Sequence, residues 1–373
     1  MAMMYKENNV FDEALERIRF VYDNHDDVVV AMSGGKDSTV LFNLTMMVAS
    51  ELNRLPLKVF WLDQEAEWQS TVDYMSGIMH RPDVKPYWFQ VPFEFPNCLS
   101  NEKNSLLVWD EAAKDLWVHE KDYDIAITEP IMDMDGINQD KAFYVLYDAC
   151  HRYAAGDSKH CAVLCGMRII ESPARRLHIV GEKGKFKGIT WCSHEKGNVR
   201  QFYPIYDFTH SDIWTAIAKN KWAYNSLYDK QYQFGVSPMW MRCSALIHET
   251  AWHNIHGLQE LEPQTYNRFC RRVAGTSTYT HAFDTEVIPK NLPFMFRDWK
   301  EYRDYLLINI VKPEYWDLFR SRWKNQTGDE WYRVHVRECI VNDTYGTINH
   351  NQEVAIAQRE HKKGKHDTRS ANL

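Results

Sequence analysis

One short segment carries the residue types best suited to chemistry, and its sequence is Ser33-Gly34-Gly35-Lys36-Asp37-Ser38. Two adjacent glycines allow a tight turn in which successive backbone N–H groups converge on an anion. The lysine adds a mobile cation, and the two serine hydroxyls can donate hydrogen bonds to phosphate oxygens. Asp37 could hold Mg2+ or orient the turn. These residues therefore predict a site for a phosphate group.

The residues on either side of this segment predict the elements that would position it. Residues 28–32 form an apolar, mostly β-branched run, which is typical of a strand buried on both faces. Residues 38–52 have apolar side chains at helical spacing, so a helix would direct its positive N-terminal end at the same spot. The segment is not a Walker A loop, because Val30 stands where that motif has its first glycine and Asp37 where it has Ser or Thr.

The wider pattern predicts an α/β protein with a parallel twisted sheet of about five strands and helices on both faces. Strand-like and helix-like stretches alternate over the first hundred residues, with strands at 28–32, 57–62 and 87–93, and a further strand at 161–165. Residues 94 to about 160 interrupt this rhythm and are interpreted as a helical insertion. We predict a first domain over residues 1–245 and a mainly helical region over 246–373, whose basic tail at 359–373 lacks periodicity.

Charged residues after two other predicted strands are further candidates for the site. Asp63 follows the second strand, where an acid could accept hydrogen bonds from a nucleoside or hold magnesium; the alternative is a solvated turn residue. Arg168 and Arg175 lie seven residues apart, so a helix would place them on one face, where guanidinium groups could bind phosphate or sulfate. Glu171 could fix one of them by an ion pair, and a surface ladder of charges is the alternative.

Asp207 allows two interpretations. It could contact the ligand, or it could cap the helix that we predict to start near residue 211. Thr209 is a good N-cap for that helix, with Asp212 in its first turn.

These motifs together resemble a known family. Ser-Gly-Gly-Lys-Asp-Ser after a buried strand resembles the PP-loop of the N-type ATP pyrophosphatases. A second motif, Gly-x-Arg-x-x-Glu-Ser-x-x-Arg, occurs in the phosphoadenosine phosphosulfate (PAPS) reductase group and matches Gly166, Arg168, Glu171, Ser172 and Arg175. The stretch from Tyr203 to Tyr228 resembles a third signature of that group, with Phe208 in place of a tryptophan. The resemblance covers roughly residues 20–245 and is closest to PAPS-reductase-like proteins related to immunoglobulin-binding regulators, which pair with ParB-like proteins.

The resemblance implies an adenine nucleotide alpha hydrolase-like fold that binds ATP or a PAPS-like adenine nucleotide together with Mg2+. It implies cleavage of ATP to AMP and pyrophosphate with adenylation of an acceptor, and Lys36, Asp37 and Arg168 as catalytic residues. The other residues implied to bind nucleotide are Ser33, Gly34, Gly35, Ser38, Asp63, Gly166, Glu171, Ser172, Arg175 and Asp207. The alternatives are a sulfonucleotide reductase or sulfur transferase, and a nucleotide-dependent regulator that works with a ParB-like, DNA-associated partner.

The cysteines argue against the reductase alternative. By resemblance, PAPS reductases use a cysteine in a C-terminal Glu-Cys-Gly-Leu-His motif, whereas no cysteine follows Cys339 in this sequence. An iron–sulfur cluster is not expected, because the adjacent and Cys-x-x-Cys pairs of adenylylsulfate reductases are missing. Cys161 and Cys165 lie within an apolar strand and are predicted to be core thiols. Cys243 stands alone and so forms no Cys-x-x-Cys pair. His248 and His253 are five residues apart, whereas the zinc-binding helix of a zincin needs a spacing of four, which argues against a zinc site of that type.

Composition limits the remaining classes. Lys plus Arg number 44 against 51 for Asp plus Glu, a net charge of -7, which does not indicate a protein that binds nucleic acid mainly by charge. The longest apolar runs are too short to span a bilayer, and the first residues do not form a secretory signal. Eight cysteines without such a signal predict reduced thiols in a cytoplasmic protein. A homo-oligomer is compatible with the sequence.

Overall fold

The computed structural model describes residues 7–344, except 101–102, 138, 181–184, 239, 249–254, 278–290 and 341. The predicted tail at 359–373 and His253 therefore lie outside the described residues. The chain divides into two compact units: one comprises residues 1–93 and 108–245, and the other comprises residues 94–107 and 246–373. No described helix is both long and apolar enough to cross a membrane.

The first unit is built on a parallel sheet of five strands in the order β3-β2-β1-β6-β7. The strands are β1 Asp27–Ala31, β2 Leu57–Leu62, β3 Val84–Phe89, β6 Cys161–Cys165 and β7 Val199–Phe202. The predicted α/β class is confirmed. The strand order reverses between β1 and β6, and in open α/β sheets ligands bind beside the carboxyl ends of the strands at such a switch point.

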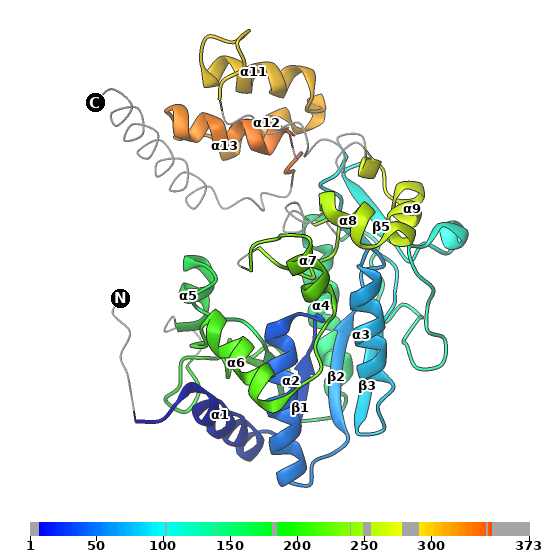
Figure 1. Cartoon of the computed structure of the whole chain (residues 1–373), viewed down its shortest axis with the longest axis vertical. Helices are drawn as coiled ribbons and strands as arrows, with labels where there is room; N and C mark the ends of the chain where they lie inside the picture. Colours follow the sequence, from blue (N-terminus) through cyan, green and yellow to red (C-terminus); the bar gives the residue numbers. More distant parts are fainter. Residues whose placement is uncertain are drawn as a thin grey trace. The chain divides into compact units, whose positions relative to one another are not determined.

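Helices cover both faces of this sheet (Figure 1). The helices of the first unit are α1 Val10–Asn24, α2 Lys36–Glu51, α3 Gln69–Met79, α4 Gln139–Ala155, α5 Pro173–Val180, α6 His210–Asn220 and α7 Leu227–Gln233. The chain passes from β1 to β2 through α2, toward the β3 edge of the sheet. It passes from β3 to β6 through α4, toward the β7 edge, and α4 packs on β1 and β2. Right-handed crossovers in opposite directions place these two helices on opposite faces.

Residues 94–160 differ from the predicted helical insertion. They contain a two-stranded sheet of β4 Phe93–Pro96 and β5 Ser105–Val108, followed by the short 3-10 helix η1 Glu111–Leu116. The one long helix described in this stretch, α4, is a crossover helix of the main sheet and not part of an insertion. The third strand also begins earlier than predicted, since β3 covers Val84–Phe89.

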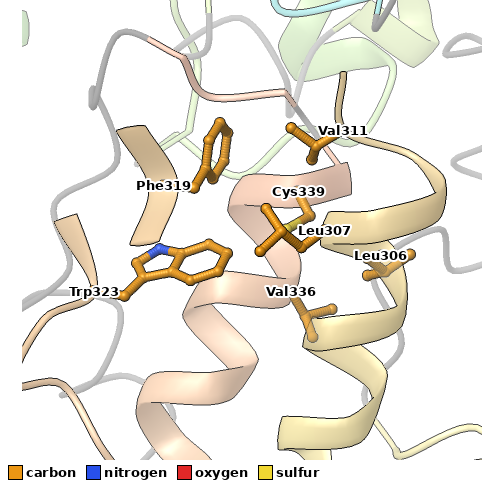
Figure 2. Close-up of a cluster of buried hydrophobic side chains, with 7 residues drawn as sticks. All are labelled: Leu306, Leu307, Val311, Phe319, Trp323, Val336 and Cys339. Atoms are coloured by element: carbon orange, nitrogen blue, oxygen red, sulfur yellow. The ribbon is translucent and has the colours of Figure 1, made fainter. Parts of the chain in front are cut away.

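The C-terminal part of the second unit is helical, as predicted. Its α-helices are α8 Leu258–Leu261, α9 Pro263–Arg272, α11 Trp299–Asn309, α12 Trp316–Arg322 and α13 Asp329–Ile340, with the 3-10 helices η4 Ile255–Gly257 and η6 Pro313–Tyr315. Figure 2 shows the core shared by the last three α-helices, which consists of Leu306, Leu307, Val311, Phe319, Trp323, Val336 and Cys339. Burial in this core raises the pKa of the Cys339 thiol well above its usual value. Cys339 is therefore a packing residue.

Candidate functional site

The loop predicted from the sequence lies between β1 and α2. β1 ends at Ala31 and α2 begins at Lys36, so the two glycines form the whole of the turn between Ser33 and the helix. Gly34 has φ +71, and a Cβ at this position would lie 2.7 Å from Thr71 Cγ2 on α3. Both the backbone angle and the close neighbour require glycine here.

The backbone amides of this loop are available to an anion. The N–H groups of Gly34, Gly35, Asp37 and Ser38 donate to no acceptor within the described part of the chain. The Lys36 N–H is the exception, because it donates to Tyr228 Oη at 3.0 Å. Free amides at the first turn of a helix, together with the positive end of the helix dipole, are a general anion-binding arrangement.

Buried side chains from α7 and the segments around it hold the loop in place. Asn225 is fully buried, and its Nδ2 donates to Gly34 O at 3.2 Å and to Thr71 Oγ1 at 2.9 Å. The Cys243 thiol donates to Ser33 O, with 3.4 Å between sulfur and oxygen. Burial, followed by the nearby Glu67 carboxyl, raises the pKa of this thiol to about 12. Cys243 is therefore a neutral thiol beside the loop.

Alternating charges extend from the loop toward α5. Lys36 Nζ lies 3.2 Å from Asp37 Oδ2, and Arg168 Nε lies 2.6 Å from Asp37 Oδ1. Arg168 Nη2 contacts Glu171 Oε1 at 3.4 Å, and Glu171 also pairs with Arg175. The predicted site residues of the two motifs are thus brought together at one edge of the sheet.

Arg168 has a different position from the one the sequence suggested. Its side chain is buried, and besides Asp37 and Glu171 it contacts the carbonyl oxygen of Phe208 at 3.3 Å. All three nitrogens of its guanidinium group contact protein acceptors. Arg168 therefore fixes Asp37 and does not present a free guanidinium group. Arg175 is the more exposed of the two arginines, with 44% of its side chain accessible.

The structure explains why Gly166 and Ser172 are the residue types found in the Gly-x-Arg-x-x-Glu-Ser-x-x-Arg motif. A Cβ on Gly166 would lie 3.0 Å from Ser38 N and 3.1 Å from Asp37 C, so only glycine lets the end of β6 approach the first turn of α2. Ser172 Oγ accepts the Arg175 N–H at 3.1 Å at the start of α5. Gly166 thus forms part of the wall of the loop, and Ser172 caps the helix that carries Arg175.

Asp63 does not face the site. It is fully buried, and its Oδ2 accepts hydrogen bonds from Trp88 Nε1 and Gln90 Nε2, both at 2.9 Å. Its Oδ1 accepts the Glu65 N–H at 3.0 Å and lies 3.2 Å from His119 Nε2. These protein donors occupy both oxygens, so we correct the prediction that Asp63 binds ligand.

Asp207 also has a partner that the sequence did not reveal. Both of its oxygens pair with the guanidinium group of Arg17 on α1, each at 2.7 Å. The cap of α6 is made instead by Thr209 and Asp212, whose side chains each accept the other's backbone N–H. The predicted cap at Thr209 is confirmed, and Asp207 is corrected from a ligand or cap residue to a link between α1 and the segment before α6.

A magnesium ion held by Asp37 does not fit this arrangement. The two oxygens of its carboxylate already face the cations of Lys36 and Arg168. Among the described residues there is no group of three His, Cys, Asp or Glu side chains placed to hold a metal ion. We therefore assign no protein-bound magnesium and derive no step through one.

Sequence reasoning missed four residues around the loop: Asn225, Tyr228, Cys243 and His210. The first two belong to a signature that was visible in the sequence, but nothing in the signature gave their contacts. His210 begins α6, and partial burial followed by the charges of Lys36 and Arg168 lowers its pKa. His210 is therefore within electrostatic reach of Lys36 and Arg168.

These features define the class of the protein. Residues 27–235 match the family model of the phosphoadenosine phosphosulfate reductase domain. The matched region includes β1, the glycine loop, the arginine motif and α7, and the chain belongs to this family.

Individual proteins similar to this chain come from bacteria and yeasts. The "Uncharacterized protein YbdN" of Escherichia coli (strain K12) is 27% identical over 329 residues, covering 84% of this chain and 78% of that protein. A PAPS reductase from Candida auris, solved as a phosphate complex, has a TM-score of 0.34 and 13% identity, covering 61% of this chain and 94% of its own. A Candida glabrata FMN adenylyltransferase with FMN and an ATP analogue has a TM-score of 0.33 and 13% identity, covering 61% of this chain and 64% of its own. These two structural similarities say nothing about the reaction of this chain.

Proposed function

We propose that this chain binds an adenine nucleotide with its phosphates on the Ser33–Ser38 loop and cleaves ATP between the α- and β-phosphates. The nucleoside monophosphate part would be transferred to an acceptor. The observation that carries the proposal is the set of amides at Gly34, Gly35, Asp37 and Ser38, at the N-terminus of α2, that donate to no acceptor among the described residues. Membership in the PAPS reductase domain family supports adenine as the base of the nucleotide.

The residues of the loop suggest how such a reaction would be assisted. Cleavage between the α- and β-phosphates develops negative charge on pyrophosphate as it leaves. Fixed amide dipoles are already oriented by the buried contacts of Asn225 and Tyr228, so they can stabilise that charge without reorganisation. Lys36 adds a full positive charge at the same end of the helix. Arg168 acts indirectly, because it holds Asp37 beside Lys36.

A product assay tests this proposal. The full chain is incubated with ATP labelled at the α-phosphate and supplied as its magnesium complex, and the products are separated. No acceptor is supplied, so water takes the adenylyl group, and we expect AMP and pyrophosphate. Turnover should be lost in Lys36→Ala and retained in the matched surface variant Arg152→Gln, which changes an exposed arginine in the last turn of α4. Formation of ADP and phosphate would refute the proposed bond cleavage, and absence of nucleotide binding by calorimetry would refute the site itself.

One observation bears on the sulfonucleotide alternative. The Cys243 thiol lies against Ser33 O, so a thiol is present at the loop, but its raised pKa keeps it protonated and weakly nucleophilic. Under the adenylation proposal, Cys243→Ser retains turnover within about tenfold, which corresponds to ~1.4 kcal/mol of barrier. Abolished turnover in a folded Cys243→Ser protein would favour thiol-dependent sulfur chemistry instead.

The narrower assignment to regulators that pair with ParB-like proteins rests on the arrangement of sequence motifs. The same loop could serve a protein that binds nucleotide as a switch without cleaving it. Tight ATP binding with no products in the assay above, and none when a cell extract is added as a source of acceptors, would favour this regulatory role over adenylation. Pull-down with a purified ParB-like protein, with and without ATP, would then test the partner directly.

A further inference from the structure

The helical part of the second unit contains a cavity that the proposed function does not use. Its volume is about 440 Å³, which is within the range of sites that hold small organic molecules. The wall is formed by Arg303, Asp304, Leu307 and Ile308 of α11, by Arg320 of α12, and by Trp323 directly after α12. All of these residues lie outside residues 27–235, which the family model matches, so the family gives the cavity no role.

The floor of the cavity is apolar and belongs to the core shared by α11, α12 and α13 (Figure 2). Leu307 and Trp323 form this floor and are only 4% and 6% exposed, whereas Ile308 is 55% exposed and lies at the rim. An apolar group that leaves water for such a floor gains binding free energy. The floor and Ile308 therefore favour a ligand with an apolar body.

The indole ring of Trp323 is held by three contacts, so the shape of the cavity is fixed. The ring stacks on that of His335, with centroids 4.6 Å apart, and Arg303 Cζ lies 5.3 Å from its centroid. Its Nε1 donates to a carboxylate oxygen of Glu338. Turning the ring into the cavity would break all of these contacts. A cavity with a fixed shape costs little conformational free energy to occupy.

One of the two arginines in the wall is already neutralised. The Arg303 side chain is only 13% exposed, and its Nε donates to Asp304 Oδ1 at 2.8 Å. The guanidinium group also lies over the ring of Tyr332, 4.9 Å from the centroid. The other oxygen of Asp304, Oδ2, lies 3.4 Å from Lys300 Nζ. Arg303 and Asp304 therefore leave no net charge for a ligand.

Arg320 has no comparable partner within the part of the chain that the structure describes. Its Nη1 lies 3.7 Å from Asp317 Oδ1, which is too far for a hydrogen bond. The two side chains are 54% and 100% exposed, and water weakens a pair of this kind. The Arg320 Cζ lies 5.5 Å from the centroid of the Trp316 ring, a contact that uses the face of the guanidinium group and not its N–H donors. These donors therefore remain available at the rim.

We propose that this cavity binds a small organic acid, with its apolar body on Leu307 and Trp323 and its carboxylate on Arg320. A carboxylate accepts two parallel hydrogen bonds from one guanidinium group, so a single available arginine suits this anion. A phosphate monoester carries more than one negative charge at neutral pH, and the wall has one uncompensated cation to offer it. The site is separate from the phosphate loop and does not depend on the proposed function.

Ligand-observed NMR titrations of the full chain test this site. The probes are phenylacetate and hexanoate, which are small acids with an aromatic and an aliphatic body, and phenylacetamide, the neutral counterpart of the first. The proteins are wild type, Arg320→Gln, Ile308→Asp and the control Lys324→Gln. Arg320 and Ile308 are exposed, so their substitution should leave folding intact. Lys324 is an exposed residue next to Trp323 that is not part of the wall.

Wild type and Lys324→Gln should bind at least one of the acids equally well, and phenylacetamide should bind about tenfold more weakly than phenylacetate. Arg320→Gln should weaken acid binding by about tenfold and amide binding by less than about threefold, because it removes only the charge-assisted pair. Ile308→Asp should weaken acid binding further, since it adds a like charge at the rim.

Two results would overturn the proposal. Failure of both acids to bind wild type refutes the site, and so does equal acid binding by Arg320→Gln and Lys324→Gln. Lys36→Ala is included to identify binding elsewhere. Acid binding that is lost in Lys36→Ala and kept in Arg320→Gln would place the acid on the phosphate loop and refute the cavity as its site.

Discussion

Lys36 is restrained before any ligand arrives. Its Nζ lies 3.2 Å from Asp37 Oδ2 and 5.6 Å from the centroid of the Tyr228 ring, and its N–H donates to Tyr228 Oη. An incoming phosphate would therefore find the lysine close to its binding position, with little side-chain entropy left to lose. Pre-organisation of this kind strengthens binding without adding a contact.

Lys36→Ala should weaken ATP binding. The substitution removes a charge-assisted hydrogen bond to phosphate, which is worth about 1.5–3 kcal/mol, so we expect the dissociation constant to rise roughly tenfold to a hundredfold. Isothermal titration calorimetry measures the change. Lys219→Ala, at an exposed lysine in the last turn of α6, is the control and should bind like wild type. Unchanged ATP affinity in a folded Lys36→Ala protein would remove the loop from the site.

The residues whose position sequence reasoning predicted well are those whose conformation depends on local order. The glycines, Lys36 and the start of α2 follow one another in the chain, so their types and spacing were enough. Asp63 and Asp207 were misassigned because their partners are distant in sequence: His119 for the first and Arg17 for the second. No local pattern reveals that a carboxylate is already satisfied by protein donors.

At the scale of elements, the site depends on how closely β6 approaches α2. Gly166 follows the end of β6 and packs on the backbone of Asp37 and Ser38, whose amides have no acceptor in the part of the chain that the structure describes. The glycine therefore has two effects: it permits the packing, and it leaves the Ser38 N–H uncovered.

Gly166→Ala should weaken both nucleotide binding and folding. The added methyl group would lie 3.0 Å from Ser38 N, so it would displace the first turn of α2 or cover its amide. We expect ATP affinity to fall by about tenfold, with destabilisation of about 1–3 kcal/mol from overpacking. Gly77→Ala is the matched control, because nothing lies within 4 Å of a Cβ there and the residue is within α3, so alanine should be neutral or slightly stabilising. Equal ATP affinity in the two variants would contradict this role for Gly166.

The helix α4 carries a buried histidine that should make stability depend on pH. His151 packs against Phe60 and Tyr147, with ring centroids 4.6 and 4.2 Å away, and its Nε2 has no hydrogen-bond partner among the described residues. Burial lowers its pKa from 6.5 to about 4. The folded state therefore binds fewer protons at this residue than the unfolded state between these two pH values.

Stability should consequently fall as the pH is lowered from about 6.5 toward 4, since the unfolded state is favoured by protonation of His151. Between pH 7 and pH 5 this residue alone should contribute about 2 kcal/mol to the loss. Urea unfolding of wild type and His151→Gln at both pH values measures the difference. A loss of the same size in both proteins would assign the pH dependence to other groups.

Periodicity identified most strands and helices of the first unit because each buries a regular face. The strands that follow β3 were not predicted from the sequence, because β4 and β5 are short and pair with each other outside the main sheet. The residues that follow β4 bond to Ile247 and Ala274, which lie about 150 to 180 residues further along the chain, and a local pattern does not contain such partners.

For the whole molecule, the division into units does not follow the order of the chain. Residues 94–107 group with residues 246–373. Cys98 N–H donates to Ile247 O at 3.0 Å, and Asn97 Nδ2 donates to Ala274 O at 3.2 Å. A Cβ on Gly275, whose φ is +91, would overlap Leu99 O. We therefore propose that the functional division is between the discontinuous nucleotide-binding unit and a second unit that includes the β4–β5 pair.

A chain ending at Ala245 should consequently fold poorly, although it keeps the whole of the matched family region. Removal of residues 246–373 would expose Cys98 and Leu99, which are buried in the full chain, and would leave the backbone N–H of Cys98 without its acceptor. We expect aggregation on size-exclusion chromatography and early proteolysis within residues 94–107.

The decisive second variant replaces residues 94–107 of the truncated chain with a short Gly/Ser linker, because β4 and β5 are neighbours and their outer ends can be bridged. This variant should be monodisperse and should bind ATP within about threefold of the full chain. If the simple truncation is itself monodisperse and as protease-resistant as the full chain, residues 94–107 do not depend on the second unit, and the division proposed here is wrong.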